Sequence, residues 1–108
     1  MRGLLLASIT LLVSIAPAAQ SSAAEAKVFA IEINKLAFAA APSDLHVNDI
    51  IEWKNADIFE HTATARDGSF DVDLPAGGVG RTVLKKAGTI DYFCKFHPGM
   101  KGRLTIAP

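Results

Sequence analysis

The sequence predicts an all-β protein, a β-sandwich or a small barrel, and three observations support this. Short runs in which apolar and polar residues alternate recur along the chain from Lys27 onward. Turn signals that contain Gly, Asn or Asp separate these runs. No apolar pattern with the helical period extends over a useful length. About seven short strands at such spacing are typical of two packed sheets or a closed one.

Each predicted strand is a run of residues bounded by turn chemistry. Phe29, Ile31 and Ile33 lie on one face of the first strand, and Asn48-Asp49 divides the next run into two. A loop at residues 74–80 precedes the later strands. In chain order, the predicted strands are residues 27–33, two runs within residues 45–55, residues 61–65, residues 81–86, residues 89–94 and residues 102–106. The aromatic residues expected in the core are Phe29, Phe38, Trp53, Phe70 and Tyr92.

Residues 1–24 are predicted to be a secretory signal peptide, which one domain follows at residues 25–108. Arg2 supplies a positive charge, residues 4–16 form an apolar run, and small residues suited to signal-peptidase cleavage follow. Cleavage is expected after Ala24, with Ala18 and Ala26 as the other candidate sites. An uncleaved membrane anchor is the alternative, but the apolar run is shorter than the roughly 20 residues that a bilayer-spanning helix needs. The sequence therefore predicts an exported protein without a membrane anchor.

The charge of the chain is balanced, and this balance excludes one class of function. The 11 basic residues include Arg2 of the predicted leader, so 10 basic residues face 11 acidic residues after its removal. A protein that binds nucleic acid needs a strong basic excess to gain from counterion release. Nucleic acid is therefore not an expected partner.

Cys94 is the only cysteine of the chain, and it lies three residues before His97 and six before Met100. An exported protein with one cysteine cannot form an internal disulfide, so this thiol pairs between chains, stays free or binds a ligand. Because Cys94 ends one predicted strand and Gly102 begins the next, the three donors are expected on the loop between them. His61, at the start of a distant strand, is the candidate fourth donor.

This donor set indicates copper rather than zinc. Two imidazoles and a thiolate with a weak axial thioether suit copper, because soft sulfur favours Cu(I) and imidazole serves both oxidation states. Zinc accepts thiolate and imidazole, but a thioether is a poor ligand for it and zinc has no redox chemistry. Met100 alone would be read as ordinary packing, and its spacing from Cys94 and His97 favours the ligand role. His46, in a strand without a nearby donor, is assigned no role.

The sequence resembles the cupredoxins, the small blue-copper proteins, and most of all their amicyanin and plastocyanin group. The matching features are Tyr92-x-Cys94, the Cys-x-x-His-x-x-Met loop with its HPGMKG segment, and Asn55 six residues before His61. The likeness covers about residues 27–106. It implies a Greek-key β-sandwich that holds one type 1 copper per chain. The copper ligands that it implies are His61, Cys94, His97 and Met100.

The resemblance also implies roles for residues around the metal. Asn55 would join the ligand loops by hydrogen bonds, and Thr62, where many relatives have Asn, would share that task. Position 60 is Glu where relatives often carry Pro, so a carboxylate lies beside the copper loop. The ring edge of His97 would reach the surface in a docking patch for a redox partner. The residues assigned to this docking patch are Phe59, Phe96, Pro98, Lys95 and Lys101.

The expected function is that of a periplasmic or otherwise exported electron carrier, a monomer whose copper cycles between Cu(I) and Cu(II). Its expected partner is a redox protein with an acidic rim, such as a c-type cytochrome or a dehydrogenase. A periplasmic copper protein for storage, delivery or tolerance is the alternative. Storage sites favour Met- or His-rich tracts, which this chain lacks. An enzyme is not expected, because Cys94 and His97 have no evident third group to orient them for nucleophilic catalysis.

Overall fold

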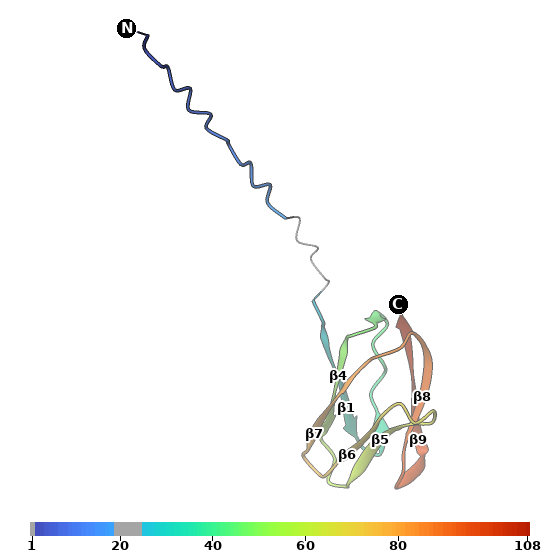
Figure 1. Ribbon diagram of the computed structural model, residues 1–108. Coiled ribbons are helices and arrows are strands. Elements are labelled where there is room, and N and C mark those ends of the chain that lie inside the picture. The colour runs from blue at the N-terminus through green and yellow to red at the C-terminus, as the bar shows by residue number, and fades with distance from the viewer. Residues whose placement is uncertain (1, 19–24) are drawn as a thin grey trace.

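A computed structural model describes residues 2–18 and 25–108 of the chain (Figure 1). Residues 2–18 form no strand or helix, and all of them are exposed. The predicted cleavage after Ala24 lies outside the described residues, so the division into leader and mature domain stays a prediction. Within the two described ranges, no helix has the length and apolar character needed to cross a bilayer.

The described residues form nine β-strands and no helix, and the strands make two sheets. In chain order they are β1 (Val28–Asn34), β2 (Ala37–Phe38), β3 (Leu45–His46), β4 (Ile50–Asn55), β5 (His61–Ala65), β6 (Asp71–Leu74), β7 (Val79–Val83), β8 (Gly88–Cys94) and β9 (His97–Ala107). The strand order is β2-β1-β4-β7 in the first sheet and β3-β9-β8-β5-β6 in the second. The predicted all-β fold, a Greek-key β-sandwich, is confirmed.

Strands β1 and β4 run parallel in the first sheet and turn alternate side chains into the core. Ile31 and Ile33 of β1 are fully buried and Phe29 is half-buried, as their alternation predicts. Ile31 pairs with Trp53 of β4, and Ile33 pairs with Asn55. Asn55 therefore continues the buried face of β4, and its amide needs hydrogen-bond partners inside the protein.

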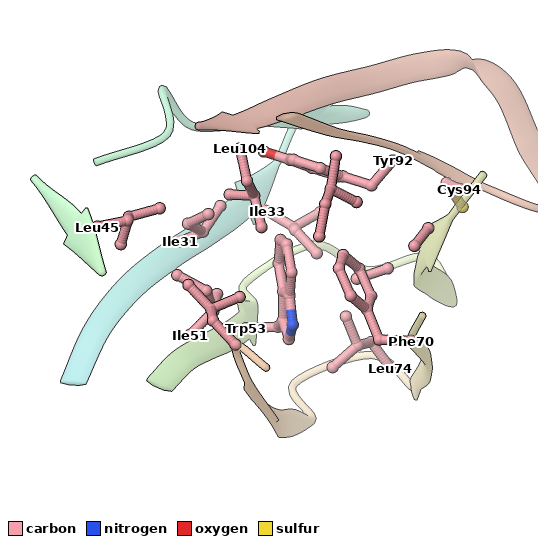
Figure 2. Packing of buried hydrophobic residues seen from close by; sticks show 14 of the residues in the cluster. Ile31, Ile33, Leu45, Ile51, Trp53, Phe70, Leu74, Tyr92, Cys94 and Leu104 are labelled. Atoms are coloured by element: carbon pink, nitrogen blue, oxygen red, sulfur yellow. The ribbon is translucent and has the colours of Figure 1, made fainter. Parts of the chain in front are cut away.

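An aromatic cluster around Trp53 fills the space between the sheets (Figure 2). Trp53 is fully buried and meets Tyr92 edge-on, with 5.1 Å between the ring centroids. The ring centroids of Phe38 and Phe70 lie 5.9 Å and 5.8 Å from that of Trp53. The indole Nε1 donates to Thr82 Oγ1 at 3.0 Å, which satisfies the polar atom of the ring. The predicted core aromatics are confirmed, although Phe29 and Phe38 are only half-buried and pack against the edge of the core.

Tyr92 depends on a glycine in the neighbouring strand. Tyr92 in β8 pairs with Gly102 in β9. A Cβ at Gly102 would overlap the ring and hydroxyl of Tyr92, so only glycine leaves room for the phenol. Burial raises the pKa of Tyr92 to about 12, and the phenol therefore stays neutral.

Strands β2 and β6 are missed by the sequence prediction, and β7 begins earlier than predicted. β2 has two residues and β6 has four, of which only Leu74 is fully buried, so any alternation in them is too short to stand out from a loop. β7 begins at Val79, inside the predicted loop at residues 74–80. Gly80 lies so close to Val72 that a Cβ would not fit. Glycine is a weak strand signal in sequence, although the close approach of two strands requires it here.

Candidate metal centre

The four donors predicted from the sequence come from three strands of the second sheet. His61 is the first residue of β5, Cys94 is the last residue of β8, and His97 and Met100 lie in β9. His61 and Cys94 are fully buried, Met100 is buried and His97 is half-buried. The site therefore lies at the end of the sandwich where β8 turns into β9, and one imidazole reaches toward the surface.

The connection after Cys94 is shorter than the predicted loop. Only residues 95–96 form the turn, because β9 already begins at His97. Cys94 pairs with His97, and the ladder then skips residues 98–100, which form a bulge. The prediction that His97 and Met100 lie on a connecting loop is therefore wrong. The sequence does not reveal that β9 begins at His97, because Pro98 and Gly99 follow and both residue types ordinarily indicate a loop.

Three donor atoms lie close enough to share one metal ion. Cys94 Sγ lies 3.6 Å from His61 Nδ1 and 3.7 Å from His97 Nδ1. All three donor atoms lie within 4.8 Å of one another. Metal–ligand bonds of about 2.0–2.3 Å at trigonal angles place sulfur and nitrogen about 3.8 Å apart. The triangle thus has the size that one metal ion requires.

The surroundings of Cys94 favour its thiolate, which is the form that binds metal. Burial alone would raise the pKa of the thiol. The backbone N–H of Thr62, which lies 3.3 Å from Sγ, and the rings of His97 and His61 outweigh burial and lower the pKa to about 6. The thiolate is therefore the main form at neutral pH.

Asn55 holds together the segments that precede and face His61. Its Nδ2 donates to the carbonyl oxygens of Phe59 and Leu74 at 2.8 Å and 2.9 Å. Its Oδ1 accepts the backbone N–H of Asp57 at 3.0 Å. These contacts fit the role that the resemblance implies, because one buried amide joins the β4–β5 connection to the end of β6.

Thr62 joins β5 to the turn between β8 and β9. Its backbone N–H points at Cys94 Sγ, and its Oγ1 accepts the N–H of Lys95 at 2.9 Å. Thr62 is fully buried. Thr62, which follows His61, thus holds Lys95, which follows Cys94.

Asp57 is a residue at the site that the sequence prediction does not single out. Its Oδ2 lies 3.0 Å from His61 Nε2, and its side chain is 8% exposed. The N–H of Leu36 and the ring of His61 lower the pKa of Asp57, although burial opposes them. The available signal was its position four residues before His61, but aspartates in connections between strands are usually solvated.

The predicted docking patch is exposed around His97. Phe59 and Phe96 are 47% and 55% exposed, and the Phe59 ring lies 6.3 Å from the His97 ring. Pro98 is also exposed. Ile58, which the sequence prediction did not include, is 82% exposed and adds to the apolar residues at this end.

Charges near the patch are mixed. Lys95 Nζ donates to Asp71 at 2.9 Å, so its charge is paired in the structure. Lys101 and Glu60 are exposed. His46 is not part of the cluster, and its side chain, 51% exposed, lies 4.0 Å from Asp49.

A β-sandwich that holds two imidazoles and a thiolate at one end defines a class of protein, the cupredoxins. A family model for the cupredoxin-like domain matches residues 4–106, so the chain belongs to the cupredoxin-like family. The donor set fits copper, because a thiolate and two imidazoles form its trigonal site and a buried thioether follows at the spacing of an axial ligand.

Solved structures of amicyanin share the fold. The reduced Cu(I) form at pH 4 of a proline-to-glycine variant of amicyanin is 23% identical, with a TM-score of 0.65 over 79% of this chain and 85% of that one. Amicyanin from Paracoccus versutus (Thiobacillus versutus) is 22% identical, with a TM-score of 0.61 over 79% of this chain and 84% of that one. A comparison with curated protein sequences gave no match.

Proposed function

We propose that the protein is an exported electron carrier that binds one type 1 copper ion through His61, Cys94, His97 and Met100. The observation that carries this proposal is the triangle of donor atoms, in which Cys94 Sγ lies 3.6 Å and 3.7 Å from the two Nδ1 atoms. Copper, when bound, supplies the exchange of one electron between Cu(I) and Cu(II). The protein makes no product of its own in this role.

The support for rapid electron exchange is the rigidity of the donors. His61 and Cys94 are fully buried. The backbone N–H of Thr62 contacts Cys94 Sγ, and its side-chain hydroxyl accepts the N–H of Lys95, so the segments around both ligands are held together. Donors that stay in place need little rearrangement when the charge of the metal changes. This feature favours electron transfer over storage or delivery, which requires that the metal leave easily.

The proposed route for electrons is through the half-buried ring of His97 into a redox partner. Phe59, Phe96 and Pro98 supply an exposed apolar surface beside that ring. Transient redox complexes use small interfaces of this kind. The partner is a redox protein such as a c-type cytochrome or a dehydrogenase, and Lys95 and Lys101 would meet an acidic rim on it.

The test is the visible and paramagnetic resonance spectrum of the protein after the addition of Cu(II). One copper ion per chain should give an intense thiolate-to-copper charge-transfer band. Cys94→Ser should abolish the band, whereas the matched variant Ser69→Ala, which alters a turn hydroxyl away from the cluster, should retain it. A strong band in Cys94→Ser would refute the ligand assignment, and a colourless wild-type complex would refute the proposed function.

A further inference from the structure

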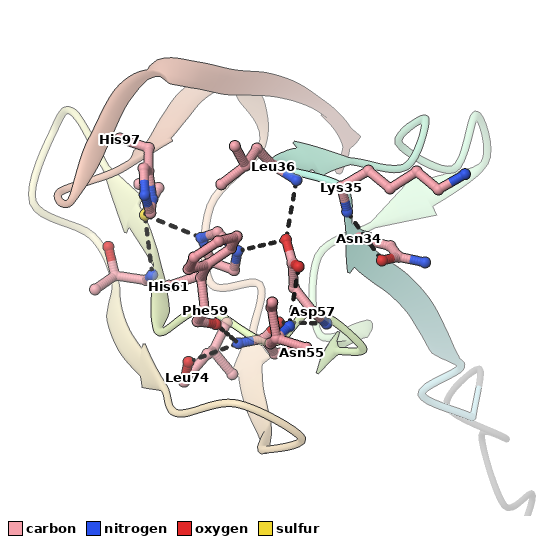
Figure 3. A network of polar contacts seen from close by, with 12 residues as sticks. Asn34, Lys35, Leu36, Asn55, Asp57, Phe59, His61, Leu74 and His97 are labelled. Atoms are coloured by element: carbon pink, nitrogen blue, oxygen red, sulfur yellow. Dashed lines mark hydrogen bonds and ion pairs between the residues drawn. The ribbon is translucent and has the colours of Figure 1, made fainter.

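The carboxylate of Asp57 makes a direct contact with the ring of His61 on the side away from Cys94. Asp57 Oδ2 lies 3.0 Å from Nε2, while Nδ1 of the same ring lies 3.6 Å from Cys94 Sγ (Figure 3). The His61 side chain is fully buried and that of Asp57 is 8% exposed. The ring therefore has a defined partner for each nitrogen, and little water competes for either contact.

The chemistry of a carboxylate decides which nitrogen of His61 carries a proton. An ionised carboxylate only accepts hydrogen bonds. Its contact with Nε2 therefore requires a hydrogen on Nε2, and in the neutral ring this leaves the lone pair on Nδ1. Because Nδ1 faces Cys94 Sγ, the lone pair points to the place that a metal ion would occupy.

Asp57 is itself held in place by two backbone N–H groups and the side chain of Asn55 (Figure 3). Its Oδ2 also accepts the N–H of Leu36 at 2.9 Å, and its Oδ1 accepts the N–H of Ile58 at 2.9 Å. Its own N–H donates to Asn55 Oδ1 at 3.0 Å. The carboxylate is thus oriented before any metal arrives, which is the arrangement expected of a group that orients a ligand.

The turn that supplies one of these N–H groups has an unusual backbone. Lys35 and Leu36, between β1 and β2, have φ angles of 51° and 59°. Side chains other than glycine adopt this left-handed region only at a cost. The hydrogen bond from Leu36 N–H to Asp57 Oδ2 helps to offset that cost, so the turn and the carboxylate stabilise each other.

We propose that Asp57 is a positioning residue that fixes the Nε2–H form of His61 and through this ring sets the affinity and reduction potential of the copper site. The copper part of this proposal rests on the proposed function. A fixed negative charge that hydrogen-bonds to a ligand makes the ligand more basic and favours Cu(II) over Cu(I). Asp57 should therefore lower the reduction potential relative to a chain without this carboxylate.

A purely structural role for Asp57 is the competing explanation. In that case the carboxylate serves only to hold the turn at Lys35 and Leu36. Its removal would lower the stability of the fold but leave the tautomer of His61 and the potential unchanged. The two explanations therefore differ in readouts that stability alone does not move.

The first experiment uses the metal-free chain and nitrogen-15 NMR of the His61 ring. The wild-type ring should show a slowly exchanging Nε2–H. In Asp57→Ala this hydrogen should exchange rapidly or move to Nδ1, and in Asp57→Asn, whose amide has a single acceptor oxygen, protection should be partly restored. A protected Nε2–H that persists in folded Asp57→Ala would overturn the proposal. If Asp57→Ala does not fold, Asp57→Asn decides instead, because protection as strong as that of the wild type in this variant would overturn the proposal.

The second experiment measures Cu(II) affinity and reduction potential in the same variants. Loss of the partner of a ligating histidine typically weakens metal binding about 10–100-fold. Asp57→Ala should show a loss of that size and a higher potential. Glu60→Gln is the matched control, because it removes an exposed carboxylate adjacent to His61 and should change affinity less than about twofold. Equal effects of the two substitutions would mean that charge alone acts and would overturn the positioning role.

The two experiments separate a failure of this inference from a failure of the proposed function. A wild-type chain without the charge-transfer band would refute the copper function, while the NMR result on the metal-free chain would still judge the contact between Asp57 and His61. A wild-type chain with the band, together with an unchanged potential in Asp57→Ala, would refute the positioning role and leave the copper function standing.

Discussion

The two ends of the sandwich are each organised around one aspartate, and the two aspartates do different things. At the end where the chain enters β1, Asp49 accepts the N–H of Lys27 at 3.1 Å and the N–H of His46 at 2.8 Å. At the metal end, Asp57 accepts two backbone N–H groups and also contacts a ligand ring. Their side chains are 7% and 8% exposed, respectively.

The difference between the ends lies in the histidine beside each carboxylate. His46 lies 4.0 Å from Asp49, but its side chain is 51% exposed, and among the described residues it is not part of the cluster that contains Cys94. His61 is fully buried between Asp57 and Cys94. A buried carboxylate thus joins segments of the chain at both ends of this sandwich. The metal end differs because the imidazole of His61 is buried and has the Cys94 sulfur on the side away from Asp57.

The largest effect that would sharpen this comparison is expected from Asn55→Ala. The substitution leaves the carbonyl oxygens of Phe59 and Leu74 and the N–H of Asp57 without their partner. Unsatisfied buried groups cost about 1–3 kcal/mol each, so the free energy of unfolding should fall by about 3 kcal/mol. Copper affinity should fall as well. Urea denaturation and copper titration measure the two effects, and a stable variant with altered copper binding alone would contradict this account.

Asp49→Ala should destabilise the fold without affecting the metal. Two N–H groups at the opposite end lose their acceptor, and the free energy of unfolding should fall by about 1–2 kcal/mol. The charge-transfer band and the reduction potential should equal those of the wild type. A shifted potential in Asp49→Ala would break the distinction between a structural end and a metal end.

The effect of Asp49 should depend on pH in a defined direction. The N–H of Lys27 holds the pKa of Asp49 below its ordinary value of 3.8, and the N–H and ring of His46 add to this against the effect of burial. A depressed pKa in the folded state means that its stabilisation is complete above pH 3.8 and is lost as pH falls through the folded-state value. The difference in unfolding free energy between wild type and Asp49→Ala should therefore shrink below about pH 4. A constant difference down to pH 2 would show that the carboxylate charge is not responsible.

The smallest effect is expected from Lys95→Gln at the metal end. Lys95 and Asp71 have side chains that are 43% and 53% exposed, and exposed ion pairs contribute little to stability. The urea midpoint and copper affinity should match those of the wild type. Electron transfer to an acidic redox partner should slow, and the difference should vanish at high salt. A loss of copper affinity would show that this ion pair supports the metal site.

Much of the fold could be predicted because burial imposes a period on the sequence. The alternation in β1 and the break at Asn48, which has a φ angle of 78°, are visible as patterns of residues. β6 could not be found in this way, because it buries only Leu74 completely. The extension of β9 to His97 was hidden for a different reason, since the ladder irregularity depends on pairing with β8 rather than on local sequence.

The donors of the candidate site could be predicted from sequence and the contacts that orient them could not. Cys94, His97 and Met100 occur at a spacing that few other structures would explain. Asp57 has no such signature, because its contact with His61 is created by the path of the β4–β5 connection and by the N–H of Leu36. Chemistry that depends on residue type is visible in a sequence, whereas a tautomer depends on geometry.

The bulge at residues 98–100 allows the metal end to vary while the sandwich stays the same. Ladder pairs bound it on both sides, with Cys94 opposite His97 and Phe93 opposite Lys101. Residues added within the bulge would lengthen an excursion that is already unpaired, and the alternation of side chains along the rest of β9 would be preserved. The number of residues between His97 and Met100 could therefore change, and with it the potential or the partner, at little cost to folding.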